Sequence, residues 1–343
     1  MSAYESLLRK ILFRMDAESA HNLGLATVAG GLVRTKLVND PRLRTEAMGI
    51  NFANPIGLAA GMDKNAVVVN HWHQLGFGFA EIGTITRHGQ PGNPKPRLFR
   101  IPEERAVVNR MGFNNQGAAA VAARLAHSSP KIPLGINLGK SKITPLDEAG
   151  ADYAASFAAL KQFASYVVIN VSSPNTPGLR ELQQLESLRT ILDAMAPAES
   201  DPPILIKIAP DLDDADLIEI AHMTAELPVA GLIATNTTID RAVLKRDWNE
   251  AGGISGAPLK TRANDVIRLL RAELPAGKVL IGVGGVFNGS DVIEKLRLGA
   301  DLVQIYTGWV YGGPSTVPKM LLELLSECDK LGLKSIKELQ PKR

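Results

Sequence analysis

The chain has 343 residues, of which 45% are apolar and 21% charged, and its 38 Lys and Arg against 35 Asp and Glu leave a formal net charge of +3. These values are typical of a globular protein and exclude a disordered chain, which needs low hydrophobicity and high net charge. The near-balanced charge gives no strong indication of nucleic-acid binding. Cys328 is the single cysteine, which excludes an internal disulfide, a cysteine-based zinc site and an iron–sulfur cluster.

No secretory signal or membrane-spanning segment is visible. The sequence has no run of about 18 apolar residues free of charge. Arg9, Lys10, Arg14 and Asp16 interrupt any apolar core of a signal peptide. The sequence therefore predicts an intracellular protein, in agreement with its poverty in cysteine.

Residues 4–15 carry apolar side chains at helical spacing, which predicts one amphipathic helix. Its apolar face consists of Tyr4, Leu7, Leu8, Ile11, Leu12 and Met15. Asp16 is placed to cap a second helix that extends to about residue 33. Two interpretations are open: a helical hairpin packed on the main domain, or a helix that lies in a membrane interface with its basic residues toward anionic lipid. The residues alone favour the packed hairpin.

The rest of the chain alternates short apolar runs with helical patterns. Runs rich in Val, Ile or Leu are typical of buried parallel strands, and they lie at Pro55–Ala59, Phe79–Gly83, Pro133–Asn137, Tyr166–Val171, Pro203–Ile208, Gly231–Thr235, Val279–Val283 and Leu302–Tyr306. Helices are predicted at Tyr153–Phe163, Leu182–Met195, Asp214–Ala225, Asn264–Glu273 and Ser290–Leu298, with Asp213, Asn264 and Asn288 as N-caps.

Eight strand–helix units predict an α/β fold, a single (β/α)8 barrel with a small N-terminal helical extension. A doubly wound sheet is the alternative, and the absence of a GxGxxG motif after the first run counts against it. The connection over residues 84–132 is too long for one barrel unit. It predicts an insertion over the barrel mouth, where long ordered loops are often functional.

Polar residues recur at the carboxyl ends of the predicted strands, where barrels place catalytic groups. They include Lys64, Thr84, Asn137, Asn170, Lys207, Thr235, Asn236 and Tyr306. A single Asn or Lys in such a place would be a turn residue or a solvated charge, but their recurrence indicates a site. Two lysines near buried strand ends require a negative partner.

The glycines after the last two strands, Gly284, Gly285 and Gly308, stand where barrels commonly bind phosphate. Amide side chains after other strands suit a flat ring with imide and amide edges. These features predict a phosphorylated cofactor and a small heterocyclic substrate. The scattered histidines and carboxylates show no metal-ligand spacing, so no metal is predicted.

The loop after the fourth strand, residues 172–178, contains two prolines and a glycine, which make it non-helical and restricted. It is either a plain surface turn or a lid that presents a hydroxyl to the substrate.

The chain resembles the dihydroorotate dehydrogenases over nearly its whole length, specifically the membrane-associated, quinone-dependent class 2 enzymes. The matching segments occur in the right order: NPIGLAAGMDK at 54–64, NRMGFNN at 109–115, NVSSPNTPG at 170–178, IKIAP at 206–210, TNTT at 235–238, GISG at 253–256, GVGG at 282–285 and QIY at 304–306. Soluble class 1 relatives carry Cys as the base in the loop after the fourth strand, whereas this chain has Ser173. Two N-terminal helices are also a class 2 trait, so the resemblance favours membrane association.

The resemblance implies that residues 1–40 form a helical segment for membrane contact and quinone access, and that residues 41–343 form an FMN-binding barrel. It implies oxidation of dihydroorotate to orotate in pyrimidine biosynthesis, with electrons passing through FMN to a membrane quinone. It places the protein peripherally at the cytoplasmic face of the cell membrane. The expected protein is a monomer without a nucleic-acid partner.

The resemblance also implies roles for individual residues. Ser173 would remove the proton from carbon-5 of dihydroorotate, and its own proton would leave through water beside Thr176 and Phe113. Substrate would contact Lys64, Asn109, Arg110, Met111, Gly112, Phe113, Asn170, Asn175, Asn236 and Thr237. FMN would contact Ala60, Gly61, Met62, Asp63, Lys64, Thr84, Asn137, Asn170, Lys207, Thr235, Gly256, Gly285, Tyr306 and Thr307. Quinone access would involve His21, Arg100 and Tyr306.

Three alternatives remain on the residues alone. The first is a soluble class 1-like dihydroorotate dehydrogenase that uses fumarate or a nicotinamide partner. The second is a Schiff-base aldolase barrel that uses Lys64 or Lys207. The third is a ligand-binding barrel without catalysis.

Overall fold

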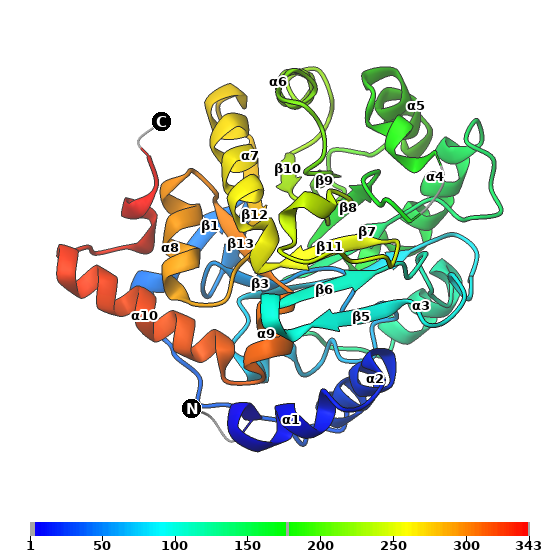
Figure 1. The fold of residues 1–343 in the computed structure, drawn as a ribbon. Coiled ribbons are helices and arrows are strands. Elements are labelled where there is room, and N and C mark those ends of the chain that lie inside the picture. The colour runs from blue at the N-terminus through cyan, green and yellow to red at the C-terminus, as the bar shows by residue number, and fades with distance from the viewer. Residues whose placement is uncertain (1–3, 176–177, 342–343) are drawn as a thin grey trace.

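The computed structural model describes residues 4–175 and 178–341. Parallel strands close into one barrel (Figure 1), with the ring order β10, β12, β13, β3, β4, β7, β8 and β9. Their bounds are Ile56–Leu58 (β3), Phe79–Ile85 (β4), Leu134–Leu138 (β7), Tyr166–Asn170 (β8), Ile204–Ile208 (β9), Gly231–Ala234 (β10), Val279–Val283 (β12) and Leu302–Ile305 (β13). Each predicted apolar run overlaps one of these strands, although β4 and β7 extend beyond the predicted ends at Gly83 and Asn137. The barrel prediction is therefore confirmed, and the doubly wound sheet is wrong.

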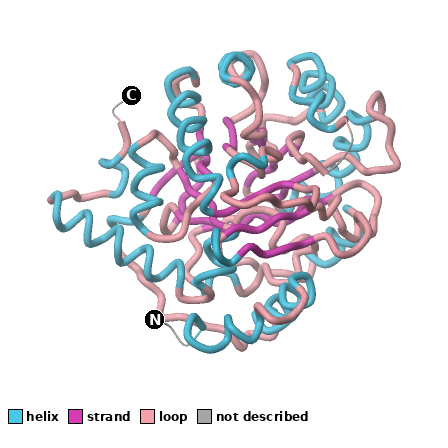
Figure 2. Tube along the Cα trace, viewed as in Figure 1, coloured by secondary structure: helices cyan, strands magenta, loops and turns pink. Residues whose placement is uncertain are grey.

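Helices surround the central strands (Figure 2) and bury the outer face of the barrel. They are α3 (Ala118–Leu125), α4 (Ala149–Leu160), α5 (Leu185–Met195), α6 (Asp214–Met223), α7 (Lys260–Glu273), α8 (Gly289–Arg297), α9 (Thr307–Gly312) and α10 (Thr316–Leu331). A second apolar cluster, which includes Phe79, Tyr166, Leu205, Ile233 and Ile281, is formed mainly by barrel-strand residues. The interior of the barrel is thus a packed core. An active site is therefore expected at the carboxyl ends of the strands.

Two of the three predicted N-caps are confirmed. The side chains of Asp213 and Asn288 accept hydrogen bonds from the backbone N–H groups of Asp216 and Asp291. Asn264 is not an N-cap, because α7 begins at Lys260, directly after a short 3₁₀ turn at Ala257–Leu259. Asn264 is an internal residue of α7, and its side chain accepts a hydrogen bond from buried Lys295 at 2.8 Å.

The predicted insertion over the barrel mouth is present. It contains β5 (Leu98–Ile101) and β6 (Ala106–Asn109), which form an antiparallel sheet with β11 (Gly253–Gly256) from the connection after β10. At the opposite end, a hairpin of β1 (Thr45–Ala47) and β2 (Ile50–Phe52) packs Phe52 against Phe79, with ring centroids 5.3 Å apart. The sequence patterns predicted neither β11 nor this hairpin.

The N-terminal segment differs from the predicted pair of regular helices. A π-helical turn at Tyr4–Leu8 leads into a short α1 (Arg9–Leu12), and α2 follows at Ala17–Ala29. Asp16 caps α2 as predicted, since its carboxylate accepts a hydrogen bond from the N–H of Ser19 at 2.8 Å. The helix ends before residue 33 because Gly30 and Gly31 follow, and Gly31 adopts a φ of +69°.

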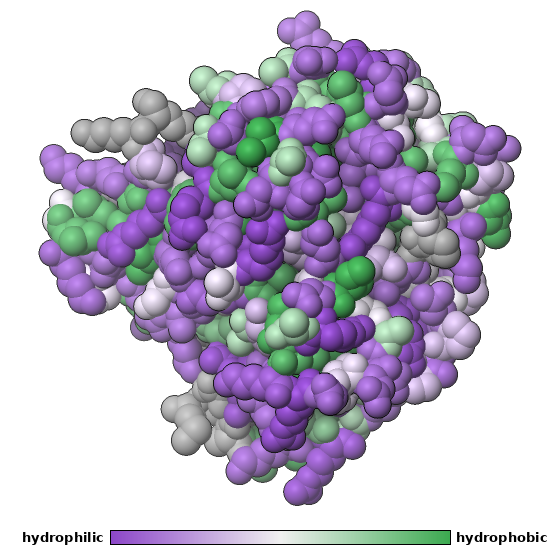
Figure 3. All heavy atoms as spheres, turned by 45° about the horizontal axis from the view of Figure 1, so that its top comes forward, coloured by the Kyte–Doolittle hydropathy of each residue, from purple (hydrophilic) through white to green (hydrophobic). Residues whose placement is uncertain are grey.

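The face of the molecule drawn in Figure 3 is mostly hydrophilic, with apolar residues in small separate groups. The N-terminal segment is different, because it exposes the large apolar side chains of Leu7, Leu8, Ile11, Leu23 and Leu32. No helix among the described residues has the length and apolar character needed to cross a bilayer.

Candidate active site

One pocket lies where the carboxyl ends of the barrel strands meet the sheet β5–β6–β11. Most of the residues that the sequence assigned to substrate and FMN line it together: Ala60, Gly61, Lys64, Thr84, Asn109, Met111, Gly112, Phe113, Asn170, Ser173, Asn175, Lys207, Thr235, Asn236, Thr237, Gly256, Gly285, Tyr306 and Thr307. Segments far apart in the sequence therefore converge on one cavity, as expected of a barrel site.

Four of the assigned residues lie outside this pocket lining: Met62, Asp63, Arg110 and Asn137. Met62 lines a second cavity. The Arg110 guanidinium turns away from the pocket, where it pairs with Glu250 at 2.6 Å and stacks on Phe99. The side chain of Arg110 therefore does not reach the pocket to which the sequence assigned the residue.

Asp63 supports the loop that carries Lys64. Its carboxylate accepts hydrogen bonds from the N–H groups of Val67 and Val68, both at 2.8 Å, and burial raises its pKa. Lys64 itself reaches the pocket, and within the described part of the chain its ammonium group has no hydrogen-bond partner. Burial lowers the pKa of Lys64 to about 8, although the Glu18 carboxylate opposes that shift.

Amides and a hydroxyl form a network at the pocket wall. Asn170 Nδ2 donates to Thr84 Oγ1 at 2.9 Å and to Asn137 Oδ1 at 3.1 Å, and Thr84 Oγ1 donates to Asn137 Oδ1 at 2.6 Å. Asn137 Nδ2 in turn donates to Glu81 Oε1 at 2.8 Å. Asn137 does not line the pocket itself, but its hydrogen bonds orient Thr84 and Asn170, which do.

Glu81 is a buried carboxylate beneath this wall. It accepts hydrogen bonds from Gln304 Nε2 at 2.6 Å and from the Tyr166 hydroxyl at 3.3 Å. Lys207 Nζ lies 3.9 Å from Glu81 Oε1. Burial lowers the pKa of Lys207, whereas the charge of Glu81 favours its protonated form. A lysine buried at the pocket is therefore held as a cation chiefly by one carboxylate.

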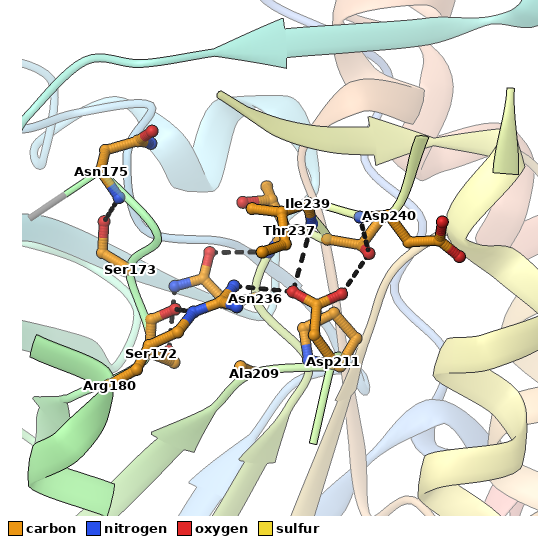
Figure 4. A network of polar contacts seen from close by, with 12 residues as sticks. Ser172, Ser173, Asn175, Arg180, Ala209, Asp211, Asn236, Thr237, Ile239 and Asp240 are labelled. Carbon is orange, nitrogen blue, oxygen red and sulfur yellow. Dashed lines mark hydrogen bonds and ion pairs between the residues drawn. The ribbon is translucent and has the colours of Figure 1, made fainter. Parts of the chain in front are cut away.

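The loop after β8 carries two neighbouring hydroxyls with different surroundings (Figure 4). Ser172 Oγ accepts a hydrogen bond from Asn236 Nδ2 at 3.0 Å and donates to Asn170 Oδ1 at 3.1 Å. Ser173 Oγ lines the pocket and accepts a hydrogen bond from the N–H of Asn175 at 3.3 Å. Thr176, part of the expected proton route, lies outside the described residues.

Arg180 connects this loop to the loops after β9 and β10 (Figure 4). Its Nε donates to the carbonyl of Ser172 at 3.3 Å, and its Nη2 pairs with Asp211 Oδ2 at 2.7 Å. Asp211 also accepts hydrogen bonds from the Thr238 hydroxyl and from the N–H of Ile239. The Arg180 guanidinium and the Asp211 carboxylate therefore join the loop after β8 to the loops after β9 and β10.

The glycine-rich end of the pocket is closely fitted. Gly285 adopts a φ of +70°, and a Cβ there would lie 2.4 Å from Cβ of Lys260. A Cβ at Gly308 would lie 1.9 Å from the carbonyl oxygen of Val286. Side chains are thus excluded, which leaves backbone N–H groups free to approach an anion.

A second cavity lies beneath the N-terminal helices, and its lining is mainly apolar. The three residues predicted for quinone access, His21, Arg100 and Tyr306, all line it. Tyr306 also lines the first pocket, so the two cavities share a wall. Arg100 donates to the carbonyls of Leu12 and Met15 at 2.9 and 2.5 Å. Burial lowers the pKa of His21 to about 3, so its imidazole is neutral.

The sequence assignments missed Gln304, Ser255 and Glu81. Gln304 and Ser255 line the pocket, and Ser255 Oγ lies 2.8 Å from Thr307 Oγ1. Glu81 and Gln304 each interrupt an otherwise apolar strand, and this break in the apolar pattern could have identified them as site residues. Across residues 4–175 and 178–341, no three His, Cys, Asp or Glu side chains come together as a metal site.

Comparisons with known proteins agree with this site. The family model described as "Dihydroorotate dehydrogenase" matches residues 42–327. Among curated proteins, the dihydroorotate dehydrogenase (quinone) of Gloeobacter violaceus is 49% identical, with 97% of each chain covered. The enzyme of the same name from Thermus thermophilus is 49% identical over 97% of this chain and 99% of its own. The crystal structure of the Eimeria tenella DHODH in complex with ferulenol superposes with a TM-score of 0.88, at 36% identity and 94% coverage of each chain.

The barrel, the pocket and these matches define the class: the chain belongs to the dihydroorotate dehydrogenase family. Within that family it belongs with the quinone-dependent dihydroorotate dehydrogenases of pyrimidine biosynthesis, and the enzymes of the family use FMN. The resemblance inferred from the sequence is confirmed. The matches therefore decide against the three alternatives, which were a class 1-like enzyme, a Schiff-base aldolase and a non-catalytic barrel.

Proposed function

We propose that this chain oxidises dihydroorotate to orotate with Ser173 as the base, and that it passes the electrons through FMN to a quinone in the second cavity. The observation that carries the proposal is the convergence of three kinds of group on one pocket. These are the Ser173 hydroxyl, the Lys64 and Lys207 ammonium groups, and the amides of Asn109, Asn170, Asn175 and Asn236.

The residues present fit FMN. Among the described residues, the buried Thr235 Oγ1 and Gln304 Oε1 have no hydrogen-bond partner, which suits a ring with a polar edge. The backbone around Gly285 and Gly308 would receive the phosphate, and Ala60, Gly61, Thr84, Lys207, Gly256 and Thr307 would surround the rest of the cofactor. When bound, FMN supplies the electron-accepting ring. Lys207 would place its positive charge beside that ring.

Substrate would lie among the amides that close the pocket. Asn175 Nδ2 reaches the Asn109 carbonyl oxygen at 3.2 Å, and Asn236 Oδ1 accepts a hydrogen bond from the N–H of Thr237 at 2.8 Å. Lys64 would pair with the carboxylate of dihydroorotate. Fixed amide contacts matter here, because misplacing a reacting ring by ~1 Å can cost about 100-fold in rate.

Ser173 would take the proton from carbon-5 of dihydroorotate onto Oγ and release its own hydroxyl proton to water. A free serine hydroxyl is a poor base. The N–H of Asn175 donates to Ser173 Oγ, and a hydrogen bond of this kind favours negative charge on the oxygen. Phe113, which also lines the pocket, would border the route by which the proton leaves.

Residues 1–40 would serve quinone access and peripheral contact with the cytoplasmic face of the cell membrane. The apolar cavity lies among the π-helical turn, α1 and α2, beside the exposed side chains of Leu7, Leu8, Ile11, Leu23 and Leu32. A lipid-soluble acceptor must leave the bilayer to react, and exposed apolar residues on a basic segment favour partial burial in a lipid interface. The barrel would act as a monomer.

The function is tested with purified holoenzyme by its visible spectrum and its choice of acceptor. A flavin spectrum that dihydroorotate bleaches, with faster turnover on a quinone analogue than on fumarate, supports the proposal. A preference for fumarate contradicts it. Membrane contact is tested by sedimentation with anionic liposomes. Leu7→Ser should reduce binding, the matched surface variant Leu322→Ser should not, and equal binding of all proteins contradicts the membrane role.

A further inference from the structure

Glu18 is a buried acidic residue on α2, a helix that otherwise buries little more than Ala20 and Val28. Its carboxylate binds the Arg97 guanidinium in a fork, with Arg97 Nη2 at 2.7 Å from Oε1 and Nε at 3.0 Å from Oε2. Both side chains are only 7–9% exposed. Lys95 adds a weaker contact, at 3.5 Å from Glu18 Oε1. Such paired hydrogen bonds between charged groups fix geometry as well as charge.

Arg97 continues this contact from α2 into the insertion that covers the barrel mouth. Its Nη1 donates to the carbonyl of Pro91 at 2.6 Å and to the carbonyl of Asn93 at 2.8 Å. The guanidinium therefore ties the turn at residues 91–93 to Glu18. Because these donors are charged, the contacts are stronger than ordinary hydrogen bonds.

Asn93 then holds the backbone of the segment that borders the pocket. Its Nδ2 donates to the carbonyl of Arg110 at 3.0 Å, and its N–H donates to the carbonyl of Met111 at 3.0 Å. The N–H of Arg110 also donates to the carbonyl of Arg97 at 2.9 Å. Met111 and the next residue, Gly112, line the pocket. A continuous set of short contacts therefore joins α2 to the pocket wall.

We propose that the Glu18–Arg97 ion pair is a positioning device through which α2 fixes the substrate-binding segment Asn109–Phe113. The N-terminal segment then serves dihydroorotate binding as well as quinone access. This inference rests on the proposed function. Neither residue lines the active-site pocket, so both act through the backbone of Arg110 and Met111. The proximity of Glu18 to Lys64, whose protonated form it favours, adds a second influence of α2 on the same pocket.

The test is Glu18→Gln in the full-length holoenzyme. The amide preserves the shape of the side chain but removes its charge, which leaves the Arg97 cation buried without its main counter-charge. We expect the KM for dihydroorotate and the Kd for orotate, read from the flavin spectrum, to rise about tenfold, because the pocket wall shifts. The KM for a short-chain quinone and liposome binding should change less than about twofold.

A matched control separates positioning from stability. Arg271 of α7 and Asp301, which directly precedes β13, form another poorly exposed ion pair, at 3.1 Å and outside the pocket lining. Asp301→Asn and Glu18→Gln should both lower the unfolding temperature, but Asp301→Asn should leave orotate affinity unchanged. Asn93→Ala removes the side-chain hydrogen bond to the Arg110 carbonyl without touching a buried charge, and it should also weaken orotate binding.

Wild-type orotate affinity in both Glu18→Gln and Asn93→Ala would overturn the inference. A rise in the quinone KM alone would also overturn it, because α2 would then serve only the second cavity. A wild-type holoenzyme whose flavin dihydroorotate does not bleach would instead contradict the proposed function, so the two failures are distinguishable.

Discussion

The Nζ atom of Lys207 lies 3.9 Å from Oε1 of Glu81, and both side chains are almost fully buried in the barrel. Lys207→Met would leave the Glu81 carboxylate buried without its counter-charge. We expect this variant to lose about 3 kcal/mol of unfolding free energy, at the lower end of what breaking a buried pair costs, because Asn137 and Gln304 still donate to Glu81. Urea unfolding of the apoprotein measures the loss.

The double variant Glu81→Gln/Lys207→Met is the control for that measurement. It removes both charges, so its stability should return to within about 1 kcal/mol of wild type. If Lys207 lies beside the flavin ring as proposed, flavin reduction should be slow in both Lys207→Met and the double variant, because both lack that cation. A double variant as unstable as Lys207→Met alone would show that the pair is not coupled as the structure indicates.

Orotate affinity should depend on pH through Lys64. Burial lowers the pKa of Lys64 to about 8; Glu18 and Asp63 favour its charged form, and Arg97 disfavours it. The ammonium group is therefore present below pH 8 and lost as the pH rises above it. If charged Lys64 binds the orotate carboxylate, the Kd should rise by up to about tenfold per pH unit above 8. Spectral titration of the flavin from pH 6 to 9.5 measures it.

Lys64→Arg is the matched control, because a guanidinium stays protonated over this range. Its orotate affinity should be lower at pH 7 but flat with pH. A flat profile in the wild-type enzyme would show that Lys64 does not pair with the substrate carboxylate.

The Arg180–Asp211 pair should support the loop that carries Ser173. Asp211→Asn removes the charge that holds Arg180 against the Ser172 carbonyl. We expect kcat to fall about tenfold through misplacement of the Ser173 hydroxyl, with FMN retained. Glu226→Gln disrupts the exposed Arg189–Glu226 pair, also a surface-facing Arg–carboxylate contact at 3.0 Å, and should leave kcat unchanged. Equal kcat in Asp211→Asn and wild type would contradict a supporting role for the pair.

The barrel was predictable because each barrel strand coincides with a short, mostly apolar run, as at Val279–Val283, which is followed by Gly284 and Gly285. The strand ends then brought Lys64, Asn170 and Lys207 to one edge without further information. The elements that pair only through distant partners were not predictable. Strand β11, Gly253–Gly256, has no apolar pattern of its own and exists because it pairs with β6.

The direction in which side chains point was the second feature that the sequence did not predict. Arg110 lies between Asn109 and Met111, which both line the pocket, yet its side chain turns outward onto Phe99 at 4.8 Å. Successive side chains of extended backbone point to opposite faces, and a motif match does not say which face meets the cavity. Glu18 and Arg97 escaped notice for a related reason, since their pairing joins residues 79 positions apart.

The central claim, that the hydroxyl of Ser173 is the base, is tested most directly by anaerobic stopped-flow mixing of the holoenzyme with dihydroorotate. Ser173→Ala should retain FMN but slow flavin bleaching about 100-fold or more. Ser172→Ala, which loses only contacts to Asn170 and Asn236, should slow it far less. Flavin bleaching at the wild-type rate in Ser173→Ala would contradict the account.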